Sequence, residues 1–206
     1  MGLETVCRVE SPAGAGEARV LLETDSVIVR GNLRQTIPFT AITRLDVAGA
    51  RLVLTHGGTR TTLHLGPLAG RWAEKIRSPR SRLEKLGVKP GLRVSVVGLT
   101  DSAFKAELSG AGCVLSWGRL RAESDLVFIG VETESELARL EKAGEAIRMD
   151  GALWVIHPKG KDGVKDTAVF ARARILGLVA TKVAKFSETH TGERLVIPVA
   201  KRTSSR

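Results

Sequence analysis

The sequence predicts two folded parts of different architecture: a small β-barrel with a C-terminal helix over residues 1–79, and an α/β domain over residues 82–201. Two observations predict this division. Apolar residues alternate along short β-branched segments in the first part, and from Pro67 onward they recur at helical spacing. After residue 82, apolar strand-like runs alternate with amphipathic helical segments. Residues 202–206 form a short basic tail.

Seven short alternating segments make up the β part, with no helical pattern between them. They are residues 5–9, 19–22, 26–30, 35–39, 42–47, 51–55 and 59–65. The last two flank His56-Gly57-Gly58, which is a strong hairpin signal because glycine accepts positive φ. The close spacing of these strands predicts a meander or small barrel.

A helix follows the strands, since Leu68, Trp72 and Ile76 recur on one helical face. Pro67 suits its first turn, and Ser78-Pro79 ends it. Seven strands and a terminal helix resemble a pleckstrin-homology (PH) barrel, whose helix plugs one open end. Such barrels bind phosphoinositides or peptides. Here the basic residues alternate with apolar ones, which predicts a solvated face; they are Arg8, Arg19, Arg30, Arg44 and Arg60.

The α/β part contains six strand-like runs and four helical segments. The predicted strands are residues 93–97, 113–117, 125–129, 152–156, 179–186 and 194–199. The predicted helices are residues 82–86, 101–108, 133–147 and 164–176. Thr133 and Glu136 have the spacing of a capping box at the start of the longest helix. This order predicts a parallel sheet covered on both faces, with an antiparallel edge at the end.

The second part resembles the S-adenosylmethionine (SAM)-dependent methyltransferase fold, a Rossmann-like architecture. Residues 89–94, 125–128 and 148–153 are similar to the segments that lead into that family's first, fourth and fifth strands. Residues 154–164 also resemble a bacterial family of short methyltransferase-like domains of unknown function. The resemblance covers about the last 120 residues and concerns the fold more than the chemistry.

Two features that the resemblance implies are missing. A methyltransferase has a glycine-rich turn after its first strand and an acidic residue after its second. The turn here keeps only Gly98 and continues with the bulky Leu99, and the second strand ends in Trp117-Gly118-Arg119, without a carboxylate. We therefore expect Leu99 and Trp117 to close the adenosine pocket. No cofactor is predicted, and SAM is disfavoured.

The functional prediction is accordingly a non-catalytic binding or regulatory module on a degenerate methyltransferase-like fold, leaning away from an enzyme. Two alternatives stay open. One is a SAM-dependent methyltransferase with a divergent cofactor site around Gly98 and Thr100. The other is a nucleic-acid-associated protein that binds through diffuse positive charge.

A retained ligand site would lie at the carboxyl ends of the strands. The candidate residues there are Gly98, Thr100, Asp101, His157, Lys159 and Lys161. An imidazole and lysines near a helix N-terminus suit a phosphate or carboxylate, so the expected ligand is an anionic small molecule. A solvated loop explains the same lysines. No catalytic residue is assigned, and no metal site, because the four histidines lack metal-ligand spacing.

The charge is +10, from 32 Lys and Arg against 22 Asp and Glu, which invites a nucleic-acid partner. The excess of basic residues is spread along the chain, and only 4% of the residues are aromatic. The sequence therefore does not predict a surface of exposed aromatic residues on which nucleic-acid bases could stack. A protein partner is the other expectation. No secretory signal, membrane-length apolar run or cysteine framework occurs, which predicts a cytoplasmic protein.

Overall fold

The structure is a computed structural model that describes residues 3–160 and 163–202. The chain divides into two compact units, one ending at Arg80 and the other beginning at Ser81. Within the described ranges, no helix has the length and apolar character needed to cross a membrane.

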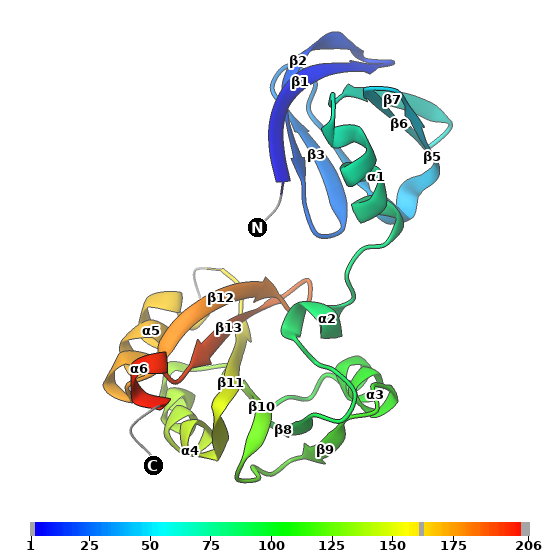
Figure 1. The fold of residues 1–206 in the computed structure, drawn as a ribbon. Coiled ribbons are helices and arrows are strands. Elements are labelled where there is room, and N and C mark those ends of the chain that lie inside the picture. The colour runs from blue at the N-terminus through cyan, green and yellow to red at the C-terminus, as the bar shows by residue number, and fades with distance from the viewer. Residues whose placement is uncertain (1–2, 161–162, 203–206) are drawn as a thin grey trace. The chain divides into compact units, whose positions relative to one another are not determined.

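The first unit is a seven-stranded antiparallel sheet with strand order β4-β3-β2-β1-β7-β6-β5 (Figure 1). Its strands are β1 Leu3–Ser11, β2 Gly14–Leu22, β3 Ser26–Arg30, β4 Gln35–Pro38, β5 Ile42–Ala48, β6 Arg51–His56 and β7 Thr59–His64. All seven predicted strands are therefore present. The β6–β7 turn has φ of +53° at Gly57 and +72° at Gly58, as the hairpin prediction requires.

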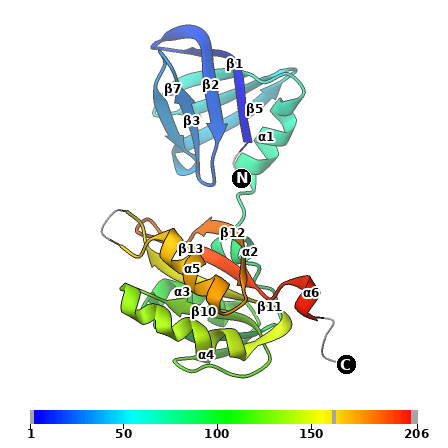
Figure 2. The same cartoon turned by 90° about the vertical axis from the view of Figure 1, so that its left-hand side faces the viewer.

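Helix α1, Leu68–Arg77, packs against this sheet, which curves in a barrel-like way (Figure 2). Trp72 and Ile76 from the helix share a core with inward-facing strand residues such as Val20, Leu54 and Leu63. The alternation seen in the sequence is the cause, since successive strand side chains point to opposite faces and only one face is buried.

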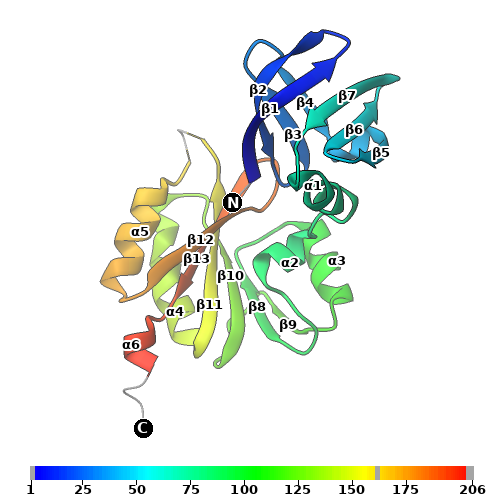
Figure 3. The same ribbon diagram turned by 45° about the horizontal axis from the view of Figure 1, so that its top comes forward.

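The second unit is built on a six-stranded sheet with order β12-β13-β11-β10-β8-β9 (Figure 3). Its strands are β8 Arg93–Val97, β9 Val114–Trp117, β10 Ser124–Gly130, β11 Ile147–Pro158, β12 Val179–Lys185 and β13 His190–Val196. Its helices are α2 Arg82–Leu86, α3 Ser102–Gly110, α4 Arg139–Ala146, α5 Asp166–Ile175 and α6 Val199–Arg202. Strands β9, β8, β10 and β11 run parallel, whereas β13 is antiparallel to both β11 and β12.

Helices cover both faces of this sheet. Val127 and Val155 point to the face covered by α4 and α5. Phe128 and Trp154 point to the opposite face, where α2 and α3 pack. The indole Nε1 of Trp154 donates a 3.0 Å hydrogen bond to the carbonyl of Leu86, so this buried side chain is a core residue with a satisfied polar atom.

The prediction of one long helix over residues 133–147 was wrong. A 3₁₀ turn over Glu134–Ala138 comes first, and the α-helix runs only from Arg139 to Ala146. The predicted capping box is absent, because the Glu136 carboxylate accepts the backbone N–H of Glu132 at 2.7 Å instead. The short helix α6 also replaces the end of the last predicted strand.

The predicted fold class, a PH-like barrel followed by a Rossmann-like domain, needs correction. The structure has a large antiparallel, barrel-like sheet and a mixed six-stranded sheet, and it does not display a clear PH-plus-Rossmann arrangement. The reason is that strand number and a terminal helix are shared by many small β folds, so they do not identify a PH domain. The antiparallel edge predicted at the end of the second part is present, and it comprises β12 and β13.

Candidate functional site

The carboxyl ends of three parallel strands meet at one edge of the second sheet. Val97 at the end of β8 pairs with Ile129 of β10, and Gly130 pairs with Ile156 of β11. The residues that follow these strands therefore line a common edge, which is where ligands bind in open α/β sheets. Gly98 and His157 both lie there, separated by β10.

Two glycines bring the ends of β8 and β10 into backbone contact. Gly98 has φ of +72°, a backbone conformation that is strained for residues with a side chain. A Cβ at this position would lie 2.9 Å from the Gly130 carbonyl oxygen. A Cβ on Gly130 would in turn collide with the carbonyl of Gly98. The turn after β8 thus depends on glycine at both positions.

Arg139 brings a positive charge to this turn. Its Nη1 donates a 2.9 Å hydrogen bond to the Gly130 carbonyl, and its Nη2 lies 2.7 Å from the Glu136 carboxylate. The same Nη1 is 2.9 Å from the position a Cβ on Gly98 would take. The sequence analysis missed Arg139, because the local sequence pattern does not distinguish an arginine on a helix surface from one whose side chain reaches the end of a strand.

The steric basis of the cofactor prediction was wrong. Leu99 and Trp117 are partly buried and pack against the core formed with α2 and α3. Gly98 and Thr100 remain exposed on either side of Leu99. Both side chains pack against the core, and Leu99 Cδ2 lies 3.0 Å from the position of a Cβ on Gly130, so neither buries Gly98 or Thr100.

Asp101, which also belongs to the predicted site, caps helix α3. Its carboxylate accepts the Phe104 backbone N–H at 2.8 Å and pairs with Arg82 at 2.8 Å. Burial raises the pKa of this carboxyl, but the Phe104 N–H and Arg82 outweigh that effect and lower the pKa overall. Arg82 also pairs with Glu107 at 2.9 Å, so Asp101 belongs to a structural ion-pair network.

His157 lies at the same edge but faces the α4–α5 layer. It is 1% exposed, and its Nε2 is 3.6 Å from Asp166 Oδ1 and 3.8 Å from Glu193 Oε1. Burial lowers the pKa of the imidazole, but Glu193, the Pro158 carbonyl and Asp166 together raise it above its ordinary value. The structure thus joins His157 to two carboxylates that the sequence prediction did not include.

The predicted lysines do not gather around His157 as a set. Lys159 Nζ donates to the backbone carbonyls of Ser187 at 2.7 Å and Glu188 at 3.2 Å, in the turn between β12 and β13. Lys161 lies outside the described residues. Among the predicted residues, Gly98, Thr100 and Asp101 therefore form one continuous turn, and His157 belongs to a separate cluster.

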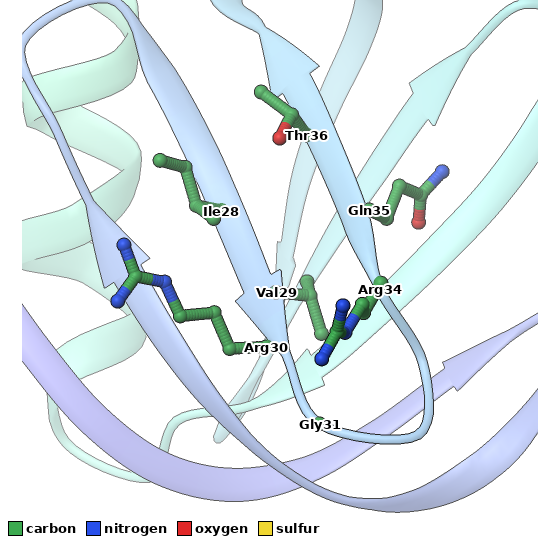
Figure 4. Close-up of a pocket in the computed structure, with 7 residues that line it drawn as sticks. All are labelled: Ile28, Val29, Arg30, Gly31, Arg34, Gln35 and Thr36. Carbon is green, nitrogen blue, oxygen red and sulfur yellow. The ribbon is translucent and has the colours of Figure 1, made fainter.

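The first unit has a hollow beside its β3–β4 hairpin, with a volume of about 470 Å³ (Figure 4). Its lining residues are Ile28, Val29, Arg30, Gly31, Arg34, Gln35 and Thr36. Two arginines make the hollow basic. All seven lining residues come from one hairpin and its turn, and they include no acid, imidazole or thiol with which to perform chemistry.

No family model matches the sequence, and no curated protein matches it. Similar solved structures include a TehB-like SAM-dependent methyltransferase from Corynebacterium glutamicum, with 13% identity, a TM-score of 0.44, and coverage of 63% of this chain and 96% of that one. Another is a magnesium protoporphyrin IX methyltransferase from Synechocystis with bound SAM, with 15% identity, a TM-score of 0.43, and coverage of 55% and 74%. A SAM-dependent O-methyltransferase from Thermotoga maritima has 10% identity and a TM-score of 0.46, and covers 94% and 93%.

These neighbours correct several predictions. The expected non-catalytic module, the leaning away from an enzyme and the expected absence of a cofactor were wrong, because the neighbours are SAM-dependent methyltransferases and one holds SAM. At such low identities, the likeness concerns the fold.

Proposed function

We propose that the second unit is a SAM-dependent methyltransferase that binds its cofactor at the turn from Gly98 to Asp101. The observation that carries this proposal is the exposure of Gly98 and Thr100 at the carboxyl edge of the parallel strands. The exposed backbone at Gly98, with the Arg139 guanidinium on its α4 side, lets a ligand approach closely, which is the use of glycine in such turns.

The residues around the turn fit the amino-acid part of the cofactor. The Arg139 guanidinium next to Gly98 is suited to pair with the α-carboxylate of SAM, as arginine does with carboxylates generally. When bound, SAM supplies a methyl group activated on a sulfonium. The end of β9 offers Gly118 and Arg119 in place of a carboxylate, so no side chain is assigned to the ribose hydroxyls.

Titration calorimetry of the full chain with SAM and with S-adenosylhomocysteine tests the proposal. We expect saturable binding of one ligand per chain. Thr100→Trp fills the exposed turn and should weaken binding by at least about tenfold, equivalent to about 1.4 kcal/mol. Thr167→Trp is the matched control, because Thr167 is exposed on α5, and this variant should bind as the wild type does.

Arg139→Gln tests the proposed carboxylate contact. Glutamine keeps side-chain N–H donors but has no charge. S-adenosylhomocysteine should bind at least about tenfold more weakly to this variant, whereas adenosine, which has no carboxylate, should bind equally to both proteins. The absence of saturable binding to the wild type, or unchanged binding by Thr100→Trp, would rule out this site.

A further inference from the structure

Three side chains with potential metal-ligating atoms converge on the α4–α5 face of the second sheet, outside the proposed cofactor turn. In the β11–β13 ladder, Val155 pairs with Glu193, and His157 pairs with Thr191. His157 and Glu193 are therefore diagonal neighbours on the same face. Asp166 joins them from the first position of α5, and one ligand atom of each residue lies within 4.8 Å of the others.

The cluster places polar atoms in the core without hydrogen-bond partners. Glu193 is 0% exposed and His157 is 1% exposed. Both Glu193 carboxylate oxygens and the His157 Nε2 lack a hydrogen-bond partner among the described residues. A buried carboxylate is costly unless a positive charge or a proton compensates it. Val155, the residue that pairs with Glu193 in the ladder, is apolar and provides neither.

The hydrogen bond of the His157 ring determines which imidazole nitrogen presents a lone pair to the two carboxylates. His157 Nδ1 lies 3.1 Å from the Pro158 carbonyl, which can only accept, so Nδ1 carries the proton in that hydrogen bond. In the neutral imidazole, the Nε2 lone pair is then directed toward Asp166 and Glu193. A backbone carbonyl that fixes one ring nitrogen in this way is the usual support of a metal-ligating histidine.

The distances also suit a shared cation. The Nε2–oxygen separations of 3.6 and 3.8 Å are too long for good hydrogen bonds. Ligand atoms bonded at about 2.1 Å to one tetrahedral zinc ion lie about 3.4 Å apart. Shifts of a few tenths of an ångström would therefore bring these atoms into the coordination sphere of one ion.

We propose that His157, Glu193 and Asp166 bind one divalent first-row transition-metal ion of the Zn²⁺ class. An imidazole with two carboxylates matches the preference of such ions, whereas Ca²⁺ and Mg²⁺ favour all-oxygen sites. The Asp166 side chain is 58% exposed, so an ion can reach the cluster from solvent on the Asp166 side. The remaining coordination position is left for solvent or a small ligand. This proposal does not depend on the proposed methyltransferase function.

Metal titration of the chelator-treated full chain tests the proposal, with Zn²⁺ followed by calorimetry and Co²⁺ by visible absorption. We expect one ion per chain and a rise in the melting temperature that saturates at that stoichiometry. Asp166→Asn, at an exposed position, and Glu193→Gln, which keeps the side-chain volume, should each weaken Zn²⁺ binding by at least about tenfold.

The matched control is His190→Asn. His190 Nε2 lies 3.1 Å from Glu132 Oε1, which makes a second imidazole–carboxylate pair outside the buried cluster. This variant should retain the stoichiometry and affinity of the wild type. Failure of Zn²⁺ and Co²⁺ to bind saturably, or equal binding by the wild type and Asp166→Asn, would overturn the proposal and assign the cluster to a proton shared between imidazole and carboxylates. Neither result bears on SAM binding at the Gly98 turn.

Discussion

Gly98 and Gly130, which are 32 positions apart in sequence, lie backbone against backbone where β8 and β10 end. Their contact leaves no room for a Cβ on Gly130, and Arg139 closes the α4 side by donating to the Gly130 carbonyl. The exposed turn that we propose as the cofactor site is therefore supported by a contact that only glycine permits.

Gly130→Ala should destabilise the second unit by at least about 2 kcal/mol, because the new Cβ forces the ends of β8 and β10 apart. Gly110→Ala is the control, since a Cβ at that α3 position meets nothing within 4 Å and its φ is not positive. Urea unfolding of the full chain, followed by circular dichroism, measures both. Equal stability of the two variants would contradict the inferred backbone contact.

Trp154→Phe should cost more stability than Trp72→Phe, although both indoles are fully buried. The first substitution leaves the Leu86 carbonyl without its donor, whereas Trp72 Nε1 has no hydrogen-bond partner among the described residues. We expect an excess of about 1–3 kcal/mol for Trp154, the cost of a buried unsatisfied acceptor. Thermal unfolding that resolves the two units is the measurement, and a larger loss for Trp72→Phe would refute this explanation.

Asp125 should make the second unit sensitive to acid. Burial raises the pKa of its carboxyl, but the Arg93 N–H at 2.7 Å and Arg148 Nη1 at 2.7 Å outweigh this and lower the pKa. A carboxyl with a lowered pKa stabilises the fold above its unfolded pKa of about 3.9, and that stabilisation is lost as the pH falls through the folded pKa.

The comparison of wild type with Asp125→Asn at several pH values tests this expectation. The wild type should be more stable by about 1 kcal/mol at pH 7, and the difference should shrink below about pH 4. Asp150→Asn is the control because Asp150 is 61% exposed, although it pairs with the same arginine. A stability difference for Asp125→Asn that does not change with pH would show that the carboxylate charge is not involved.

Arg82→Lys should loosen the packing of α2 on α3. The guanidinium of Arg82 pairs with Asp101 and Glu107 and lies 5.0 Å from the Phe104 ring centroid. Lysine keeps the charge but loses the planar stacking and the forked hydrogen bonds, so we expect a loss of about 1–2 kcal/mol. Arg174→Lys at an exposed position on α5 should change stability by less than about 0.5 kcal/mol. Unfolding midpoints in guanidinium chloride compare the two.

The strands of both units were predictable because alternation and β-branching are local properties of the sequence. Helix α2 illustrates the same point: it was predicted over residues 82–86, it spans Arg82–Leu86, and Gly87 ends it at φ of +79°. The segment after Thr133 was not predictable, because the carboxylate of Glu136 had two other partners in space, Glu132 and Arg139.

The candidate sites were predictable only in part. The prediction that ligands bind at the carboxyl strand ends placed Gly98, Thr100 and His157 on one edge. Glu193 was missed because the last strand was predicted to begin at residue 194, whereas β13 begins at His190. Had the alternation with Leu195 been followed back two positions, Glu193 would have been placed on the buried face.

The sequence alone determined most of the strands and helices, since each of these is defined by the periodicity and end signals of its own residues. The segment after Thr133 and the short helix α6 are the exceptions. The tertiary structure decided where Leu99 and Trp117 point, which cation reaches Gly98, and that His157 lies against Asp166 and Glu193. Side-chain direction at a turn and contacts between distant residues depend on packing between elements. The local pattern of a single chain does not contain that information.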